Sequence, residues 1–276
     1  MSDSLTHTDP AALLSGMPVY LSRMAAVNAA LETGGPVTLD DFFMHYDGDA
    51  PLAAAAEFFE GSVTVLDLGC GYGSSLLWLA NRSEDYRALA GVDLLDDNII
   101  IARSLAARLM TDDHRTSFFA HDVSTLNEAT LGGGCGVDQV DAVLSLNVGV
   151  HLTEVQREKM WQFVSEILLP GGRVYIEDFY RLRELDEREE ELLAQQLACP
   201  YLPDLNEYLS VLSDTMEDAK VVHEDLSFNY GVFAAQHHET YDGDDEVRRE
   251  FYRAMSFLLN DGAVGGLRIR LERPPQ

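Results

Sequence analysis

The stretch that decides the fold reads Val65-Leu66-Asp67-Leu68-Gly69-Cys70-Gly71-Tyr72-Gly73. Its apolar half predicts a short buried strand, and its glycines predict a sharp turn that opens a helix. Because glycine has no Cβ atom, the backbone there can approach a ligand closely. The spacing is Gly-x-Gly-x-Gly, with Ser74 where a dinucleotide-binding loop has its third glycine. We therefore expect Gly69, Gly71 and Gly73 to form the floor of a nucleoside crevice.

Strand and helix patterns alternate along the chain after this stretch. The expected strands are 63–68, 88–93, 116–122, 141–146 and 173–179, and the expected helices between them are 74–80, 98–109 and 153–168. A glycine-rich loop is expected at 132–134. Strands separated by helices predict an α/β fold with a doubly wound, mostly parallel sheet and right-handed crossovers.

The composition is that of a globular protein of 276 residues, 46% hydrophobic and 24% charged. No apolar run approaches the roughly 20 residues that cross a bilayer, and the first residues do not resemble a signal peptide. Cys70, Cys135 and Cys199 form no C-x-x-C pair, which argues against disulfides or a zinc site. We expect a cytoplasmic protein with no metal and no membrane partner, with a homodimer left open.

The charge is strongly negative, because 47 Asp and Glu residues face 19 Lys and Arg residues for a net charge of −28. Nucleic-acid binding depends on neutralising phosphates with basic side chains, so a nucleic-acid substrate is not expected. Only Lys159 and Lys220 are lysines. This bias fits a salt-rich cytoplasm, in which carboxylates keep the surface hydrated, and equally a genome that favours arginine codons.

Acidic residues stand at the expected ends of the first three strands. Asp67 precedes the glycines, where its carboxylate can receive the ammonium group of an amino acid. Asp93 ends the second strand, where an acidic residue binds both hydroxyls of a ribose. Asp122 ends the third strand and can accept from the amino group of adenine, with Leu94 and Val123 on either side of the ring. Asn147, after the fourth strand, is expected in the same crevice.

This series, followed by Leu169-Pro170-Gly171-Gly172, resembles the class I methyltransferases that use S-adenosylmethionine. The resemblance covers roughly residues 59–179. It implies a seven-stranded Rossmann-like sheet with an antiparallel last strand, S-adenosylmethionine as cofactor and S-adenosylhomocysteine as product. The regions then expected are an N-terminal helical lid (1–58), the cofactor-binding core (59–180), a cap inserted after the fifth strand with a late core strand (181–242), and a closing helix and strand (243–276).

A base is needed in methyl transfer only when the acceptor atom carries a proton at the reaction pH. His151 is the candidate, because it follows the fourth strand and ligands bind at the carboxyl ends of such strands. The passage resembles the phosphoethanolamine N-methyltransferases, in which a histidine pairs with an N-terminal tyrosine. That resemblance implies Tyr20 as the partner of His151. The competing interpretation is that His151 caps or packs under the following helix.

The acceptor site is expected at the end of the fifth strand. Glu177, Asp178 and Tyr180 stand there, and carboxylates suit an amine acceptor. Aromatic rings such as Tyr180, Tyr46 and Tyr201 can stabilise a methylated ammonium by cation–π contact. The segment 42–46 is expected to fold over the cofactor as part of the lid, or else to staple the first helices.

The C-terminal half also resembles small-molecule enzymes such as the phosphoethanolamine and sarcosine/dimethylglycine methyltransferases. The resulting hypothesis is methylation of an amine or amino acid nitrogen, on the way to a betaine-type osmolyte. The basic residues that would bind a phosphate group are not evident in the cap. An O- or S-methyltransferase, a protein that binds S-adenosylmethionine without turnover, and a nicotinamide-dependent oxidoreductase are the alternatives, and the spacing at Gly73 argues against the last.

Overall fold

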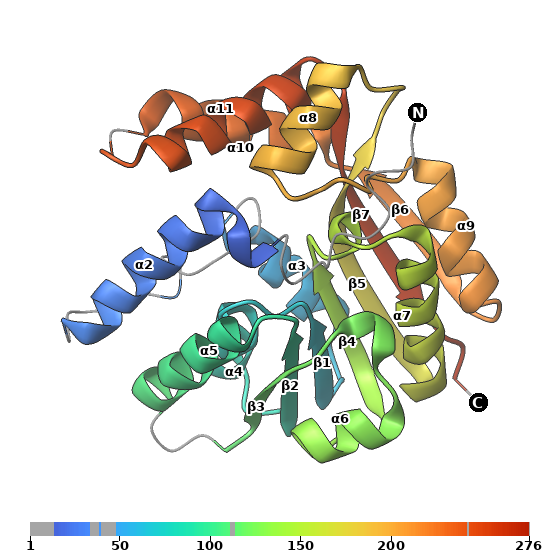
Figure 1. Cartoon of the computed structure of the whole chain (residues 1–276). Helices are drawn as coiled ribbons and strands as arrows, with labels where there is room; N and C mark the ends of the chain where they lie inside the picture. Colours follow the sequence, from blue (N-terminus) through green and yellow to red (C-terminus); the bar gives the residue numbers. More distant parts are fainter. Residues whose placement is uncertain (1–13, 34–38, 40–47, 111–113, 242, 276) are drawn as a thin grey trace.

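The computed structural model describes residues 14–33, 39, 48–110, 114–241 and 243–275. Its centre is one seven-stranded sheet (Figure 1). The strands lie in the order β3 (Thr116–Ala120), β2 (Ala88–Asp93), β1 (Thr64–Leu68), β4 (Val140–Leu146), β5 (Leu168–Arg181), β7 (Val264–Glu272) and β6 (Lys220–Asp225). Only β7 runs antiparallel to its neighbours. The predicted mostly parallel, Rossmann-like sheet with an antiparallel last strand is confirmed.

The first strand occupies the point where the strand order reverses. β1 pairs in parallel with β2 on one side and with β4 on the other. The chain therefore builds outward in one direction and then crosses over to build in the other. In such sheets a crevice opens beyond the carboxyl ends of the strands at this point. The glycines after Leu68 lie at that crevice.

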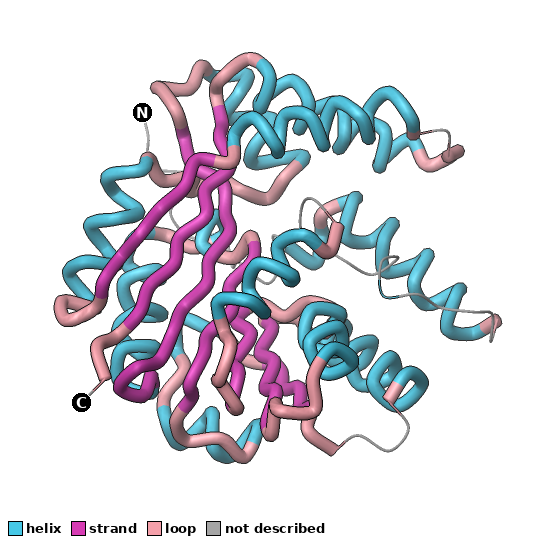
Figure 2. The backbone as a smooth tube through the Cα atoms, turned by 180° about the vertical axis from the view of Figure 1, so that it is seen from behind, coloured by secondary structure: helices cyan, strands magenta, loops and turns pink. Residues whose placement is uncertain are grey.

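Helices cover both faces of the sheet (Figures 1 and 2). One face packs against α3 (Ala50–Phe58), α4 (Ser74–Arg82) and α5 (Asp96–Leu109), and the other against α6 (Glu128–Cys135), α7 (Glu154–Ile167) and α9 (Leu205–Thr215). Along β1, Val65 packs in the core on the side of α3, α4 and α5, whereas Leu66 and Leu68 pack in the core on the side of α6, α7 and α9. This alternation is expected because successive side chains of a strand point to opposite faces of the sheet. These helices pack on the two faces of the sheet, and the candidate site lies at the carboxyl ends of the strands.

A third hydrophobic core lies beyond the end of the sheet. Here α8 (Glu187–Gln196), α10 (Ser227–Thr240) and α11 (Glu246–Asn260) pack around buried Leu193, Tyr230 and Leu258. The long strands β5 and β7 extend into this cap (Figure 1). The N-terminal helix α2 (Pro18–Glu32) contacts both α11 and α5, so it bridges the cap and the core. The expected boundaries between the four regions stay a prediction.

The glycines at 132–134 are helical rather than a loop, contrary to expectation. Helix α6 begins with a capping box between Asn127 and Thr130, which satisfies two backbone amides at its start. A Cβ atom on Gly134 would lie 2.5 Å from the ring of Phe119. The helix therefore uses this glycine to approach β3 closely, and that gain outweighs the low helix propensity of glycine.

Several predicted strand boundaries also differ from the structure; the third strand, expected over 116–122, ends at Ala120. The late core strand expected in the cap is β6, which ends at Asp225, whose carboxylate accepts from the amide of Ser227 at 2.8 Å and helps to start α10. The fifth strand was expected over 173–179. It runs from Leu168 to Arg181, because Leu168 pairs with Val140 of β4 and β7 pairs with the strand in register from Arg173 to Arg181. Within the described residues no helix is both long and apolar enough to span a bilayer.

Candidate active site

A cavity of about 1000 Å³ opens beyond the carboxyl end of β1. We call it the glycine-loop cavity. Eight of the nine residues predicted to bind the cofactor line it: Asp67, Gly69, Gly71, Asp93, Leu94, Asp122, Val123 and Asn147. Gly73 does not line it, but lies at the N-terminus of α4 with a left-handed backbone. Side chains from the ends of four strands thus converge on one space.

The glycine loop needs glycine for two reasons. Gly69, Gly71 and Gly73 all have positive φ angles, of 68°, 52° and 73°, a region that L-residues rarely adopt. In addition, a Cβ atom on Gly69 would lie 2.5 Å from Cγ2 of Val148, in the loop after β4. The backbone of the glycine loop therefore packs directly against the side chain of Val148 in the loop after β4. Because the glycines have no side chains, they do not fill the cavity.

Asp93 ties the glycine loop to the end of β2. Its Oδ2 accepts from the amide of Gly71 at 2.9 Å, while Oδ1 accepts from the amide of Leu95 and from the side chain of Asn98, each at 2.9 Å. Burial raises the pKa of Asp93, and these donors partly oppose that rise. Because Oδ2 has only one of these donors, it can still accept from a ligand hydroxyl.

Two buried oxygens at the cavity wall have no hydrogen-bond donor among the described residues. They are Oδ2 of Asp67 and Oδ1 of Asn147. Burial, together with the charge of Asp93, raises the pKa of Asp67 well above its usual value. A buried acceptor without a donor is costly. A ligand that brings a cationic donor, such as an amino acid ammonium group, would satisfy Asp67.

Asp122 lies at the far wall and begins the short 3-10 turn η2 (Val123–Thr125). Its Oδ1 accepts from both the amide and the hydroxyl of Ser124, at 2.8 Å each. Its second oxygen therefore has no part in this turn. Val123 lines the same wall, so this end of the cavity offers an apolar surface beside a carboxylate, as a nucleobase requires.

A second cavity, with an empty volume of about 690 Å³, lies between the core and the cap. We call it the apolar cavity. Its wall consists of Val19, Tyr20, Arg23, Asn147, Val150, His151, Phe179, Leu193, Leu197, Cys199, Leu202, Phe251, Met255, Leu258 and Val264. Tyr20, Asn147 and His151 also line the glycine-loop cavity. The two cavities therefore meet at these three side chains.

His151 stands at this junction with a defined tautomer. Its Nδ1 lies 2.7 Å from the carbonyl oxygen of Ala198, which can only accept, so Nδ1 carries the proton. Its Nε2 then presents a lone pair, 3.5 Å from the hydroxyl of Tyr20. Burial lowers the pKa of His151. The imidazole is therefore neutral near pH 7 and able to accept a proton.

Tyr20 reaches the junction from α2. Burial and the nearby Cys199 and Asp93 raise the pKa of its hydroxyl. The hydroxyl therefore stays protonated at ordinary pH and acts as a hydrogen-bond donor. The structure thus brings together a histidine and a tyrosine 131 positions apart, the two residues that the resemblance implied as partners.

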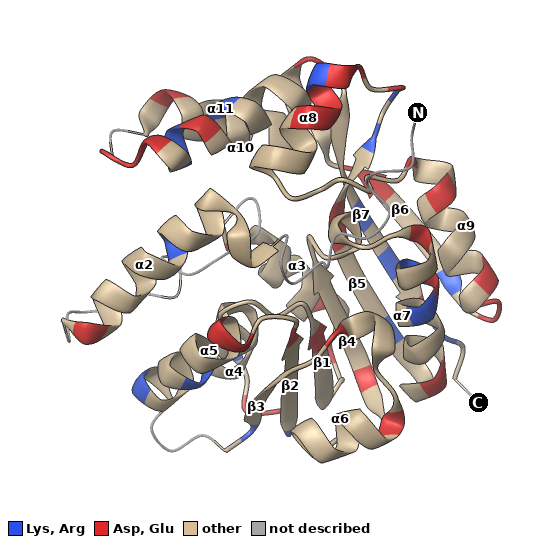
Figure 3. Cartoon of the chain, viewed as in Figure 1, with Lys and Arg blue, Asp and Glu red and all other residues tan. Residues whose placement is uncertain are grey.

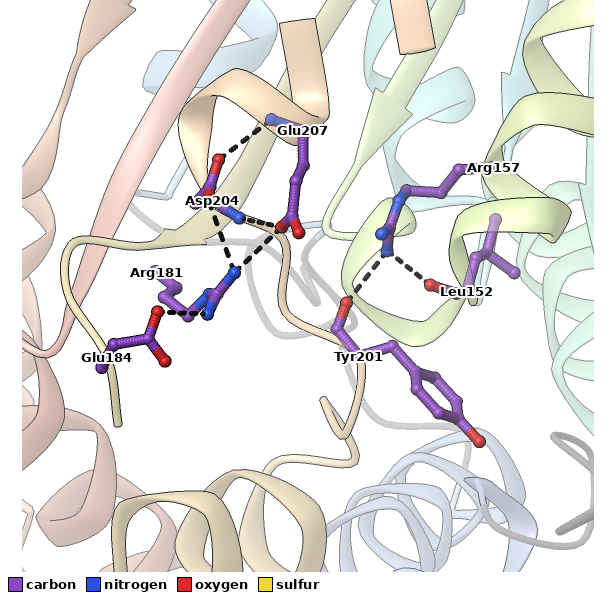
Figure 4. Close-up of polar contacts among 7 residues, drawn as sticks. All are labelled: Leu152, Arg157, Arg181, Glu184, Tyr201, Asp204 and Glu207. Atoms are coloured by element: carbon purple, nitrogen blue, oxygen red, sulfur yellow. Dashed lines mark hydrogen bonds and ion pairs between the residues drawn. The ribbon is translucent and has the colours of Figure 1, made fainter. Parts of the chain in front are cut away.

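A buried arginine that the sequence analysis missed holds the loop of His151. Nη1 of Arg157 donates to the carbonyl oxygens of Gly149 at 3.1 Å, Leu152 at 2.5 Å and Tyr201 at 2.9 Å. Figure 4 shows the last two of these contacts. Arg157 thereby joins the loop after β4 to the cap segment. The only signal in the sequence was an arginine in the first turns of an otherwise amphipathic helix.

Two of the residues expected to bind the acceptor lie away from the cavities. Glu177 and Asp178 do not line either cavity, and they lie within β5 rather than at its end. Glu177 accepts from Tyr175 at 2.5 Å, from Arg268 at 2.8 Å and from Tyr230 at 2.9 Å. Because β5 continues to Arg181, these carboxylates are interior strand residues that bind the structure's own donors.

Asp178 lies beneath the His151 loop. It accepts from the amide of Phe179 and from the hydroxyl of Tyr208, at 2.9 Å each. Burial raises the pKa of Asp178 to about 7, against the effect of these donors and of Arg157. Gly149 lies close to this carboxylate, since a Cβ atom added to Gly149 would be 2.7 Å from Oδ2 of Asp178. Asp178 therefore supports the loop from below.

Tyr180 and Tyr201, two of the three tyrosines expected near the acceptor, do not line the cavities described. Tyr180 packs against Gly265 of β7, where a Cβ atom would lie 2.8 Å from its ring. Tyr201 contributes its carbonyl oxygen to Arg157 (Figure 4). Neither is among the residues at the wall of either cavity. Tyr46 and the rest of the segment 42–46 lie outside the described residues.

Comparisons with known proteins agree with this geometry. The model of the family described as methyltransferase domain matches residues 65–172. Methyltransferase GfsG from Streptomyces halstedii is 27% identical over 123 residues, which are 45% of this chain and 40% of that protein. The chain thus spans less than half the length of this curated relative.

Solved structures share the fold over most of the chain. Phosphoethanolamine N-methyltransferase 2 from Haemonchus contortus, solved with S-adenosylhomocysteine, has a TM-score of 0.72 at 17% identity, over 98% of this chain and 61% of that one. The cyclase SpnF has a TM-score of 0.64 at 17% identity, over 94% and 97%. Such identities show the fold alone. The chain therefore has the Rossmann-like fold of these methyltransferase structures, and its residues 65–172 match the model described as methyltransferase domain.

Proposed function

We propose that this protein uses S-adenosylmethionine to methylate a hydroxyl group of a small, largely apolar molecule. The observation that carries the proposal is the position of Nε2 of His151, a neutral base at the junction of the two cavities. One cavity has the donors and acceptors for an amino acid nucleoside, and the other is apolar. The base thus lies where a cofactor and an acceptor would meet.

The residues present fit the cofactor. The orphaned oxygen of Asp67 suits its ammonium group, Asp93 its ribose hydroxyls, and Asp122 with Val123 its adenine. S-adenosylmethionine, when bound, supplies a methyl group activated by a sulfonium. The loop of Gly69 and Gly71 lets the backbone form one wall of this space. The fit rests most directly on Oδ2 of Asp67, a buried acceptor that no described residue satisfies.

The wall of the apolar cavity favours a hydroxyl over an amine. No carboxylate stands among the described residues that line it. The two carboxylates expected to attract an amine, Glu177 and Asp178, bind tyrosine hydroxyls, an arginine and backbone amides instead. A cationic amine or amino acid would enter this cavity without a counter-charge, which is unfavourable. An uncharged hydroxyl needs only a hydrogen-bond partner, and Nε2 of His151 provides one.

The chain's contribution to the reaction is positioning, exclusion of water and removal of one proton. An alcohol is a weak nucleophile until a base accepts its proton. Nε2 of His151 takes that proton, and the carbonyl of Ala198 stabilises the resulting imidazolium through Nδ1–H. The hydroxyl of Tyr20 donates toward the same site and orients the acceptor. The apolar wall, including Leu197 and Met255, keeps water away.

The test is a turnover screen with S-adenosylmethionine and three matched sets of apolar alcohols, amines and thioethers, read by release of S-adenosylhomocysteine. Turnover of alcohols that is lost in His151→Gln supports the proposal. Turnover of thioethers that survives in His151→Gln contradicts it, because a thioether needs no base. Cofactor binding without turnover of any set would indicate a binding protein or a different chemistry, such as the one named for the cyclase SpnF.

A further inference from the structure

We propose that Arg23 recognises an anionic group on the acceptor, so that the acceptor is an apolar molecule with one negative charge, such as a hydroxylated carboxylic acid. This inference rests on the proposed function in that it assigns the apolar cavity to the acceptor. Arg23 is the only formally charged side chain among the described residues that line this cavity. Figure 3 shows α2 with its basic residues in blue, and Arg23 is the basic residue in the sequence of this helix.

Arg23 differs from the other arginines near the site in having no partner among the residues that the structure describes. Within the described residues it forms no ion pair or hydrogen bond. By contrast, Arg181 contacts Glu184, Asp204 and Glu207 (Figure 4). With 47 acidic residues against 19 basic ones, partners are abundant in this chain. A half-buried guanidinium left without one beside an apolar wall is costly unless a ligand provides the counter-charge.

The place of Arg23 on α2 defines where the anionic group would lie. Residues three and four apart on a helix share a face, with about 5–6 Å between their Cβ atoms. Val19, Tyr20 and Arg23 follow this spacing, and all three line the apolar cavity. Tyr20 marks the reaction end, because its hydroxyl is 3.5 Å from His151. The anionic group therefore binds about one helical turn from the reacting hydroxyl.

The rest of the cavity explains why one anionic group is enough. Its remaining wall is apolar, with Leu193 and Leu197 from the cap and Phe251 and Met255 from α11. A molecule that leaves water for this wall gains from burial of its hydrocarbon part. The negative field of a protein with a net charge of −28 repels anions in general. Arg23 thus supplies a local attraction that selects an acid over a neutral molecule.

The carboxylate of S-adenosylmethionine is the competing partner for Arg23. Arg23 lines the apolar cavity and is not among the residues of the glycine-loop cavity. This placement favours the acceptor as the source of the anion. The two sources differ in a measurable way, because removal of the guanidinium would weaken binding of the cofactor in one case and of the acceptor in the other.

The experiment measures affinity by calorimetry in the full chain saturated with S-adenosylhomocysteine. The probes are decanoate and decanol, which differ in charge but share an apolar chain. The variants are Arg23→Gln, Arg23→Lys and, as a control for net charge, Arg87→Gln, an exposed arginine that lines neither cavity. The affinity for S-adenosylmethionine is measured separately for each protein.

We expect wild type and Arg87→Gln to bind decanoate about ten- to hundredfold more tightly than decanol, as a charge-assisted hydrogen bond predicts. Arg23→Gln should lose that preference, Arg23→Lys should keep most of it, and the affinity for S-adenosylmethionine should not change. A preference that survives in Arg23→Gln, a loss of cofactor affinity in its place, or failure of wild type to bind either probe overturns the proposal. The proposed function is judged apart from this, by turnover of alcohols.

Discussion

The Nδ1 atom of His151 lies 2.7 Å from the carbonyl oxygen of Ala198, 47 positions later in the chain. This contact joins the loop after β4 to the cap, so the orientation of the imidazole depends on both parts. Ala198 has a positive φ angle of 53°, which costs about 1–2 kcal/mol for a residue other than glycine. The cap is therefore locally strained at Ala198, the residue whose carbonyl oxygen contacts Nδ1 of His151.

His151→Gln should lower kcat by about 10²–10⁴-fold, the usual effect of losing a general base. In the wild type, burial lowers the pKa of His151, so the rate should fall only at a pH below about 6.5 and stay level from pH 7 to 8. The pH profile of kcat/KM checks this. Tyr20→Phe should reduce kcat less and keep the same profile. A wild-type profile that rises through pH 8 would contradict the assignment of His151 as base.

The same shift has a consequence for stability. The folded state disfavours the protonated imidazole, so the unfolded state binds more protons as the pH falls below 6.5. His151 therefore lowers the free energy of unfolding as the pH falls below 6.5. His151→Gln should show a weaker decrease in melting temperature between pH 7 and pH 5 than wild type does.

Asp67→Asn should weaken the binding of S-adenosylmethionine and stabilise the protein without ligand. The raised pKa of Asp67 means that folding disfavours its ionised form at any pH above the ordinary value of 3.8, so removal of the charge relieves that cost at pH 7. The cofactor ammonium would lose a charged partner, and its affinity should fall about 10–100-fold. Calorimetry and thermal unfolding measure the two effects.

The exposed Asp97→Asn serves as the control for Asp67→Asn, because it removes the same formal charge on the outside of α5. It should leave the affinity for the cofactor unchanged and lower the stability by no more than about 1 kcal/mol, the contribution of a carboxylate in the first turn of a helix. An Asp67→Asn protein that binds the cofactor as tightly as wild type would mean that the orphaned oxygen of Asp67 serves another group.

Gly69→Ala should destabilise the fold for two separable reasons. The left-handed backbone costs about 1–2 kcal/mol with a Cβ atom, and the contact with Val148 adds about 1–3 kcal/mol of overpacking. Val148→Ala in the same chain should recover only the second part. A double-mutant cycle in denaturant measures the difference. If the two substitutions are additive, the clash between these loops is not what requires glycine.

The sequence was sufficient for the fold and for the glycine-loop cavity, for a physical reason. Parallel strands end at one edge, so Asp67, Asp93 and Asp122 could be placed together once each was seen at a strand end. The acceptor side could not be placed in this way. Leu193 and Met255 reach the apolar cavity from helices whose packing depends on contacts far apart in the chain. No local pattern states which face of such a helix meets the core.

The error at the fifth strand has a similar origin. Glu177 and Asp178 read as strand-end residues because the apolar run stops near Phe179. The antiparallel partner β7 extends the strand to Arg181 and places Arg268 opposite Glu177. A carboxylate that is buried beside an arginine from another strand looks the same in the sequence as one that faces a ligand. Only the register distinguishes them.

Glu177→Gln tests this distinction directly. Glu177 is 2% exposed and its oxygens bind Arg268 and two tyrosines, so the substitution leaves a guanidinium without its buried partner. Breaking such a pair costs about 3–5 kcal/mol, and the partial exposure of Arg268 favours the lower end of that range. Thermal or denaturant unfolding measures the loss.

Glu224→Gln is the matched control, since Glu224 also pairs with Arg268 but is half-exposed, and its loss should cost about 1 kcal/mol or less. Once each variant is assayed well below its melting temperature, the KM for the acceptor should equal that of wild type in both. A raised KM in Glu177→Gln with unchanged stability would restore the acceptor role that the sequence suggested. The opposite pattern identifies Glu177 as a residue that joins β5, β7 and α10, because Arg268 and Tyr230 reach it from the latter two elements.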